Sequence, residues 1–215
     1  MKIHLYPASG HIHPYPTGED IADPDTLPFR VWIPERNFLV LGYSQEPERE
    51  FNLDAVGKHD IPVYKRKGGG GAVLLSPGNV CVALRFPRKP GFGIAEYFSA
   101  ANGMIRAALR DALSLDLEPR GISDLAFEER KVLGSSLQLT RNSAVYLASI
   151  LVSVDRVLLD ELLRHPSREP DYRGGRVHHD FVRNLNEIPG LESLTPERVT
   201  EILRAYFPAA IAAPA

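Results

Sequence analysis

One segment in the middle of the chain combines an acid, a lysine and small residues. Asp124, Lys131 and the run Gly134-Ser135-Ser136 all fall within "GISDLAFEERKVLGSSLQ". An aspartate can hold Mg²⁺ or a ribose hydroxyl. A lysine can stabilise the charge that develops on a phosphate or an activated carboxyl group. The same residues also fit the charged tip of a solvent-exposed hairpin, so this segment alone leaves both interpretations open.

A second segment places three cations, Lys65-Arg66-Lys67, directly before the four glycines 68–71, and Ala72 then opens an apolar run. Glycine lets backbone N–H groups approach a ligand with no Cβ in the way. Successive amides of this kind can form an anion-binding concavity. The alternative is a solvent loop tipped with lysine. The pattern is neither G-x-x-x-x-G-K-S/T nor G-x-G-x-x-G before a helix, because a strand follows it.

Runs of β-branched and aromatic residues predict the strands that would hold these two segments. We expect a hairpin over residues 29–43, with its turn at Pro34 to Asn37. The further strands that we expect lie within residues 60–67, 71–75, 80–86, 124–140 and 143–154. Residues 80–86 are so continuously apolar that a central, buried strand fits them best.

Apolar residues at helical spacing predict a helix over residues 93–113. A short amphipathic helix is expected after Asp155 as N-cap, and a closing helix after Thr195, with Pro196 in its first turn. Strands come in runs and helices are interspersed without βαβ regularity. This order indicates an α+β fold around a mixed or antiparallel sheet rather than a dinucleotide-binding fold.

The predicted domain organisation has an irregular N-terminal segment over residues 1–28, one domain over 29–207 and a frayed, flexible tail over 208–215. Residues 166–180 are predicted to be a polar loop, because they are rich in proline, glycine and arginine.

Composition limits the classes of protein and of partner. The chain has 215 residues with 44% hydrophobic and 24% charged, the balance of an ordinary soluble globule. Its formal net charge of −2 provides no global basic field for nucleic acid or an anionic membrane. No apolar run is long enough for a membrane span, and the first residues are too polar for a secretory signal. We therefore expect a cytoplasmic protein that binds neither nucleic acid nor membrane.

Cysteine and histidine leave little room for a structural metal site. The single cysteine, Cys81, excludes an internal disulfide and a cysteine-based zinc site. His11, His13, His178 and His179 could be read as a metal cluster, but solvated histidines in loops fit the same pattern.

Four segments, in order, resemble the motifs of the lipoate–protein ligase A family, which is related to the biotin–protein ligases. "VLGYSQEPEREFN" resembles V-I-G-R-x-Q-N-x-x-x-E-x-N, and "KRKGGGGAVLLSPGNVC" resembles R-R-x-S-G-G-G-A-V-x-H-D-x-G-N. "GISDLAFEERKVLGSSLQ" resembles G-x-N-D-L-x-x-x-x-x-K-x-S-G-S-A, and "HHDFVRNLNEIPG" resembles V-R-S-R-V-T-N-L-x-E. Four motifs in order, over roughly residues 29–207, are far more specific than any one of them.

The resemblance implies a fold, with a bent mixed sheet flanked by helices, and an activity. Ligases of this family activate lipoate with Mg-ATP to lipoyl-AMP and pass the lipoyl group to a lysine of a lipoyl carrier protein. By the matched motifs Lys131 would be catalytic, on the acyl carbonyl and phosphate, and Asp124 would hold the nucleotide or Mg²⁺. The residues expected to bind lipoyl-AMP are Arg66, Gly69, Gly70, Gly71, Ala72, Asn79, Asp124, Gly134, Ser135 and Ser136.

The chain departs from the family pattern at several positions. Lys65 replaces an arginine, so anion binding there is expected to be less exact in geometry. Gly68 replaces a serine, which predicts a looser loop. Leu75-Ser76 and Leu147-Ala148 replace histidine-containing pairs, and the bulkier apolar side chains at the second pair would reshape the acyl tunnel. The chain also ends where many bacterial ligases continue into an accessory domain. This predicts a short form, whose accessory part would be absent or a separate chain.

Two other functions stay open beside ATP-dependent ligation. Octanoyl or lipoyl transferases of the family use a cysteine thioester, but Cys81 lies in the apolar run "NVCVALRF", where a small buried side chain is expected. A non-catalytic module that binds a lipoyl group or a carrier is the second alternative. The retention of Arg66, Asp124 and Lys131 together argues against it.

Overall fold

The computed structural model describes residues 28–212, and residues 12–14 by their backbone alone. Most of the predicted N-terminal segment therefore lies outside the described residues, together with His11, the side chain of His13 and residues 213–215 of the tail. Within 12–14, a short strand replaces part of the irregular segment that the sequence predicts.

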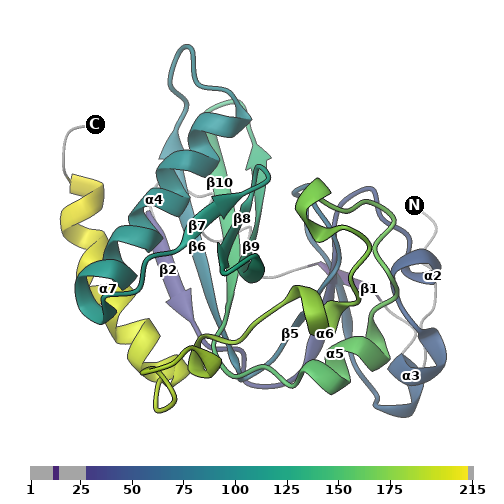
Figure 1. The fold of residues 1–215 in the computed structure, drawn as a ribbon. Helices are drawn as coiled ribbons and strands as arrows, with labels where there is room; N and C mark the ends of the chain where they lie inside the picture. The colour runs from purple at the N-terminus through teal and green to yellow at the C-terminus, as the bar shows by residue number, and fades with distance from the viewer. Residues whose placement is uncertain (1–11, 15–27, 213–215) are drawn as a thin grey trace.

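The larger of two sheets is antiparallel and has six strands in the order β2-β6-β10-β9-β8-β7. Its strands are β2 (Phe29–Trp32), β6 (Asn79–Pro87), β7 (Glu118–Arg120), β8 (Asp124–Phe127), β9 (Arg130–Leu139) and β10 (Ser143–Leu151). The helices α4 (Ile94–Leu113) and α7 (Pro196–Ala212) lie together on one face (Figure 1). Strand β6 is central and buried, which confirms the prediction for residues 80–86.

The smaller sheet is mixed and has the order β1-β4-β3-β5. Its strands are β1 (Ile12–Pro14), β3 (Phe38–Leu41), β4 (Val63–Lys65) and β5 (Val73–Leu75). Strands β1 and β3 run parallel to β4, and β5 runs antiparallel to β3. The short helices α2 (Pro47–Glu50), α3 (Leu53–Lys58), α5 (Arg156–Leu162) and α6 (His178–Phe181) gather around this sheet in Figure 1. The single-turn helices η1 (Asp171–Arg173) and η2 (Leu185–Glu187) complete the described elements.

The predicted hairpin over residues 29–43 is wrong. Strand β2 pairs with β6 in the larger sheet, whereas β3 pairs with β4 and β5 in the smaller one. Strand β3 is buried on both faces, since Leu39 and Leu41 join one apolar cluster and Val40 joins another. Both edges of β3 are taken by β4 and β5, so the connection at Pro34 crosses between sheets instead of folding back.

The predicted N-caps of α5 and α7 are confirmed, whereas the predicted end of α7 is corrected. The carboxylate of Asp155 accepts hydrogen bonds from the amides of Val157 and Leu158, and the Thr195 hydroxyl accepts one from the amide of Arg198. Helix α7 continues through Pro208 to Ala212, so residues 208–212 are not a frayed tail. The side chain of Ile211 packs against the main core, which stabilises this last turn. Among the described residues, no helix is both long and apolar enough to cross a bilayer.

Candidate functional site

Lys131 and Asp124 form a close ion pair between two inner strands of the larger sheet. The Nζ atom of Lys131 lies 2.9 Å from Oδ1 of Asp124, and the side chain of Asp124 is 7% exposed while that of Lys131 is 25% exposed. The two residues belong to neighbouring strands, β9 and β8. The cation is therefore held in place by a buried carboxylate while part of it remains accessible to a ligand.

An irregularity in β9 decides which way Lys131 points. Leu125 pairs with Leu133 but Ala126 pairs with Lys131, so Val132 is one extra residue in the strand. Such a β-bulge changes the face on which the following side chains project. Lys131 consequently lies over Gly134, where an added Cβ would come within 2.8 Å of the lysine Nζ. The glycine leaves the space that the lysine side chain occupies.

The glycine loop is closed around the guanidinium of Arg66. Its Nε and Nη2 donate to the carbonyl of Gly69 at 3.1 and 2.9 Å, and Nη2 also donates to the carbonyl of Gly71 at 2.6 Å. Arg66 is 6% exposed. Since all described peptide bonds are trans, the N–H groups of Gly70 and Ala72 point away from Arg66, opposite to these carbonyls. Both N–H groups are therefore directed away from the guanidinium, and an anionic group is the kind of ligand that such donors favour.

The open side of the loop is free of protein atoms. An added Cβ at Gly69 or Gly71 would meet nothing within 4 Å, and both glycines are exposed. Gly70 adopts φ +95°, a conformation that favours glycine. An added Cβ there would lie 3.4 Å from the Cβ of Ser136, so the loop rests against β9. Ser136 and Gly134 share one face of that strand and lie about 7 Å apart.

The structure thus brings most predicted site residues together on one face of β9. This group contains Arg66, Gly69, Gly70, Gly71, Asp124, Lys131, Gly134 and Ser136. Ala72 directly follows the loop, and it packs against the apolar cluster that contains Leu39 and Leu41. Its chemistry is that of a cation and outward-pointing amides beside an open space, which suits a ligand with a phosphate or an activated carboxyl group.

Two predicted site residues lie elsewhere. Asn79 is 2% exposed, and its Oδ1 accepts hydrogen bonds from the amide and hydroxyl of Ser76, so it closes the turn before β6. Ser135 alternates with Gly134 and Ser136 and faces the helix-covered side, where its hydroxyl donates to the carbonyl of Ser123 at 2.5 Å. Both side chains hold the backbone rather than face the loop.

Lys65 and Gly68, two residues that differ from the family pattern, each make specific contacts in the structure. The Lys65 ammonium donates to the carbonyl of Gln45 at 3.1 Å, which ties the strand before the loop to the turn after β3. Gly68 is buried, and its carbonyl accepts a hydrogen bond from the amide of Tyr43. An added Cβ at Gly68 would lie 3.3 Å from the carbonyl oxygen of Leu137. Close packing accounts for this glycine, so the expectation of a looser loop is wrong.

Gly42 and Tyr172 are contributors to which the sequence assigned no role. An added Cβ at Gly42 would lie 2.1 Å from the carbonyl oxygen of Gly70, so this glycine allows the loop to approach. Tyr172 comes from the polar loop and donates its hydroxyl to Oδ2 of Asp124 at 2.9 Å. Burial and the charge of Asp124 raise the pKa of Tyr172. A tyrosine 48 residues away carries no local signal for this contact, whereas Gly42 lies in the first motif.

Leu75 and Leu147, two further departures, lie in one apolar cluster with Val40 and Cys81. The cluster joins the two sheets, because Leu75 belongs to β5 and Leu147 to β10. Leu147 pairs with Ser136, directly beside the glycine loop. The Cys81 thiol is 1% exposed, and burial raises its pKa, so the reactive thiolate form is disfavoured.

Asp124 does not form a magnesium site with the other described residues. Its Oδ1 faces Lys131 and its Oδ2 accepts from Tyr172. In the described part of the chain no group of three or more histidine, cysteine, aspartate or glutamate side chains could hold a metal ion. The idea of a histidine metal cluster at His178 and His179 finds no support there either. Mg²⁺ is often held by one or two carboxylates together with the phosphates of a substrate, so Asp124 would contribute to a magnesium site only beside a bound nucleotide.

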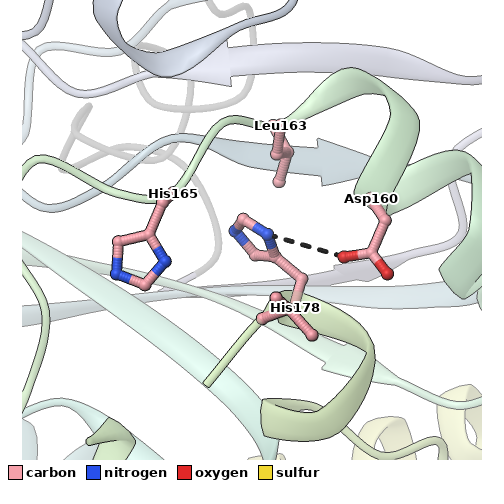
Figure 2. Close-up of a pocket in the computed structure, with 5 residues that line it drawn as sticks. Asp160, Leu163, His165 and His178 are labelled. Atoms are coloured by element: carbon pink, nitrogen blue, oxygen red, sulfur yellow. Dashed lines mark ion pairs between the residues drawn. The ribbon is translucent and has the colours of Figure 1, made fainter. Parts of the chain in front are cut away.

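A hollow of about 360 Å³ lies beside α6 and is lined by Asp160, Leu163, His165, Val177 and His178. Figure 2 shows the ring of His178 between Asp160 and His165. Its Nδ1 lies 3.7 Å from a carboxylate oxygen of Asp160. Burial, followed by the charges of Arg173, His165 and Lys131, lowers the pKa of His178 from 6.5 to about 4. His178 is therefore neutral near pH 7.

Comparison with known proteins identifies the family of the chain and its fold. The sequence model of the lipoyl protein ligase A/B catalytic domain matches residues 18–208. The chain belongs to this family. The match to the lipoyl ligase A/B catalytic domain covers the larger sheet, strands β3, β4 and β5 of the smaller sheet, and all the positions at which the sequence predicts site residues.

Solved structures show the same fold. A bipartite lipoate protein ligase from Thermoplasma acidophilum, studied with its E2 lipoyl domain, has a TM-score of 0.72 at 22% identity, over 85% of this chain and 70% of that one. A lipoate-protein ligase A bound with ATP has a TM-score of 0.72 at 23% identity, over 85% of this chain and 72% of that one. LipL1 of P. falciparum, in complex with lipoate, has a TM-score of 0.67 at 21% identity, over 85% of this chain and 49% of that one. The α+β prediction, with a mixed and antiparallel sheet flanked by helices, is confirmed.

Proposed function

We propose that the protein is an ATP-dependent lipoate–protein ligase, which converts lipoate to lipoyl-AMP and transfers the lipoyl group to a lysine of a lipoyl carrier. One observation carries the proposal: the ion-paired Lys131 and the outward amides of the Arg66-held loop lie on one face of β9. Membership of the lipoyl ligase A/B family and the relatives bound to lipoate or ATP support it.

The charges of the site suit both half-reactions. When the lipoate carboxylate attacks the α-phosphate, negative charge spreads over the phosphate oxygens, and a cation and amide donors there lower the barrier. When the amine of the carrier attacks the lipoyl carbonyl, Lys131 would polarise that carbonyl and stabilise the departing phosphate. The Asp124 carboxylate would keep the Lys131 ammonium in place through both steps.

The second candidate is an octanoyl or lipoyl transferase that works through a thioester. Its nucleophile would have to be Cys81, the single cysteine of the chain. Cys81 packs between the two sheets at 1% exposure, and burial raises its pKa. A thiol in this state is a poor nucleophile, so we favour ligation. A variant Cys81→Ala that retains activity would support this choice.

The decisive experiment incubates the protein with lipoate, Mg-ATP and a panel of lipoyl domains, and measures carrier mass and pyrophosphate. We expect one carrier to gain the mass of a lipoyl group while pyrophosphate is released. A parallel arm supplies synthetic lipoyl-AMP without ATP. Transfer in this arm alone would mean that activation needs a separate accessory chain. If neither arm modifies any carrier, the ligase proposal fails and a non-catalytic binding module becomes the better description.

The variant Lys131→Ala tests the assignment of the catalytic residue. Loss of its charge from the reacting groups should reduce transfer by at least about 100-fold. The matched control is Lys58→Ala, because Lys58 is exposed and pairs only with Glu161 on the surface among the described contacts. Transfer by Lys131→Ala at the rate of this control would show that the role is misassigned.

A further inference from the structure

The carboxylate of Asp124 is held from two sides. Lys131 lies 2.9 Å from Oδ1, and the Ser123 hydroxyl donates to the same oxygen at 3.3 Å. The Tyr172 hydroxyl donates to the other oxygen, Oδ2, at 2.9 Å. A carboxylate held at one oxygen can rotate about its last torsion, which is broad. Donors at both oxygens fix its plane, and with it the direction in which Oδ1 meets the lysine.

Tyr172 is held in the site by contacts that do not involve its hydroxyl. Its ring packs against Phe181, with the ring centroids 5.1 Å apart. The Nη2 atom of Arg176 donates to the carbonyl of Tyr172 at 2.7 Å and to that of Glu129 at 3.0 Å. Glu129 lies in the turn between β8 and β9. The polar loop is thereby tied to the hairpin that carries Asp124 and Lys131.

Because of these contacts, the substitution Tyr172→Phe removes one interaction and leaves the others in place. The ring would keep its contact with Phe181 and the backbone its bonds to Arg176, so only the hydrogen bond to Asp124 would be lost. Arg120 and Arg176 are the other charged groups that act on Tyr172. Neither one acts through the hydroxyl bond, so the variant leaves their arrangement unchanged.

We infer that Tyr172 is a positioning residue, which fixes the Asp124 carboxylate so that Lys131 is held over Gly134 and toward the glycine loop. Its importance for catalysis rests on the proposed function, whereas its control of Lys131 is a property of the free protein. The polar loop of residues 166–180 is thus part of the reaction centre through one hydroxyl group.

The first test measures Lys131 in the free protein by trace acetylation with an N-hydroxysuccinimide ester, using the Lys58 peptide as internal reference. In Tyr172→Phe the carboxylate can turn away from Lys131, so the amine is held less firmly and is more accessible to the reagent. We expect the acetylation rate of Lys131 to rise about three- to tenfold, as for loss of one hydrogen bond that holds its partner. Asp124→Asn should raise it further, and Tyr206→Phe, on α7, should not change it. An unchanged rate in Tyr172→Phe overturns the inference.

The second test measures transfer kinetics in a double-mutant cycle. We expect Tyr172→Phe to lower kcat about tenfold with KM for lipoate within about twofold, as for loss of one hydrogen bond to a charged group. Combined with Asp124→Asn, it should cause no further loss, because Tyr172 acts through Asp124. Independent, multiplicative losses would contradict this route. If the native protein transfers nothing, the proposed function fails, while the acetylation test still decides the role of Tyr172.

Discussion

Gly42 and Gly70 set the distance between the turn after β3 and the glycine loop. The added Cβ at Gly42 would lie 2.1 Å from the carbonyl oxygen of Gly70, which no side chain can accept without a backbone shift. The Arg66 side chain is fixed in one position, because it donates to the carbonyls of Gly69 and Gly71 at the same time. At the scale of single residues, the site depends as much on absent side chains as on charged ones.

Gly42→Ala should therefore displace the loop. We expect the free energy of unfolding to fall by about 1–3 kcal/mol, the usual effect of overpacking, and transfer activity to fall at least tenfold. Thermal unfolding and the carrier assay measure the two effects. The matched variant is Gly69→Ala, where the new methyl group meets open space. Equal stability of the two variants would contradict the close approach.

His178 should make stability depend on pH. Its pKa is about 4 in the folded protein against 6.5 for the ordinary group, so the unfolded chain binds more protons between these values. The free energy of unfolding should therefore rise by about 2 kcal/mol as the pH increases from 4 to 6.5. The same amount is lost as the pH falls back through this range. Denaturant unfolding at several pH values should show this slope. His178→Gln should flatten it, whereas His179→Gln, at an exposed neighbour, should leave it.

Among the elements, β9 and α7 show where sequence patterns succeed and fail. The composition of residues 124–140 predicts strands, which is right, but the extra residue Val132 depends on pairing with β8 and has no local signature. The proline at 208 predicts the end of a helix, yet α7 continues to Ala212, because Ile211 packs on the core. Tertiary contacts outweigh local propensity in both cases.

A chain that ends at Phe207 tests the extended helix. Loss of the Ile211 contact should lower the free energy of unfolding by about 1 kcal/mol, from the apolar surface that is no longer buried. Thermal unfolding of this chain, compared with one that ends at Ala212, isolates the last turn of α7. If the two chains unfold at the same temperature, residues 208–212 contribute nothing and the frayed end was the better prediction.

In the described part of the molecule, an apolar cluster joins the two sheets. Val40 and Leu75 come from the smaller sheet, and Cys81 and Leu147 from the larger one. The glycine loop connects β4 and β5 of the smaller sheet, whereas Lys131 lies on β9 of the larger sheet. The candidate site therefore exists only while the two sheets stay together. Strand composition predicted where most strands lie, but neither the pairing of β2 and β3 nor the division into two sheets followed from it.

Hydrogen exchange should show both sheets opening together in the native protein. Leu75→Ala removes a side chain that is 4% exposed from the joint and should cost about 2–5 kcal/mol. We expect amides of β3 and β5 to lose more protection than those of β6 and β10, because the smaller sheet can then open alone. Equal loss of protection in all four strands would show that the cluster does not join two separable units.

The sequence by itself determined the α+β class, the central strand β6, the helix α4 and the family, because these follow from local periodicity and from motifs in a given order. It also singled out Lys131, Asp124 and the glycine loop as the candidate chemical groups. Only the tertiary structure decided that the bulge at Val132 turns Lys131 over Gly134 and that Arg66 faces its own loop. It alone brings Tyr172 to Asp124, since that contact depends on how segments far apart in the chain pack together.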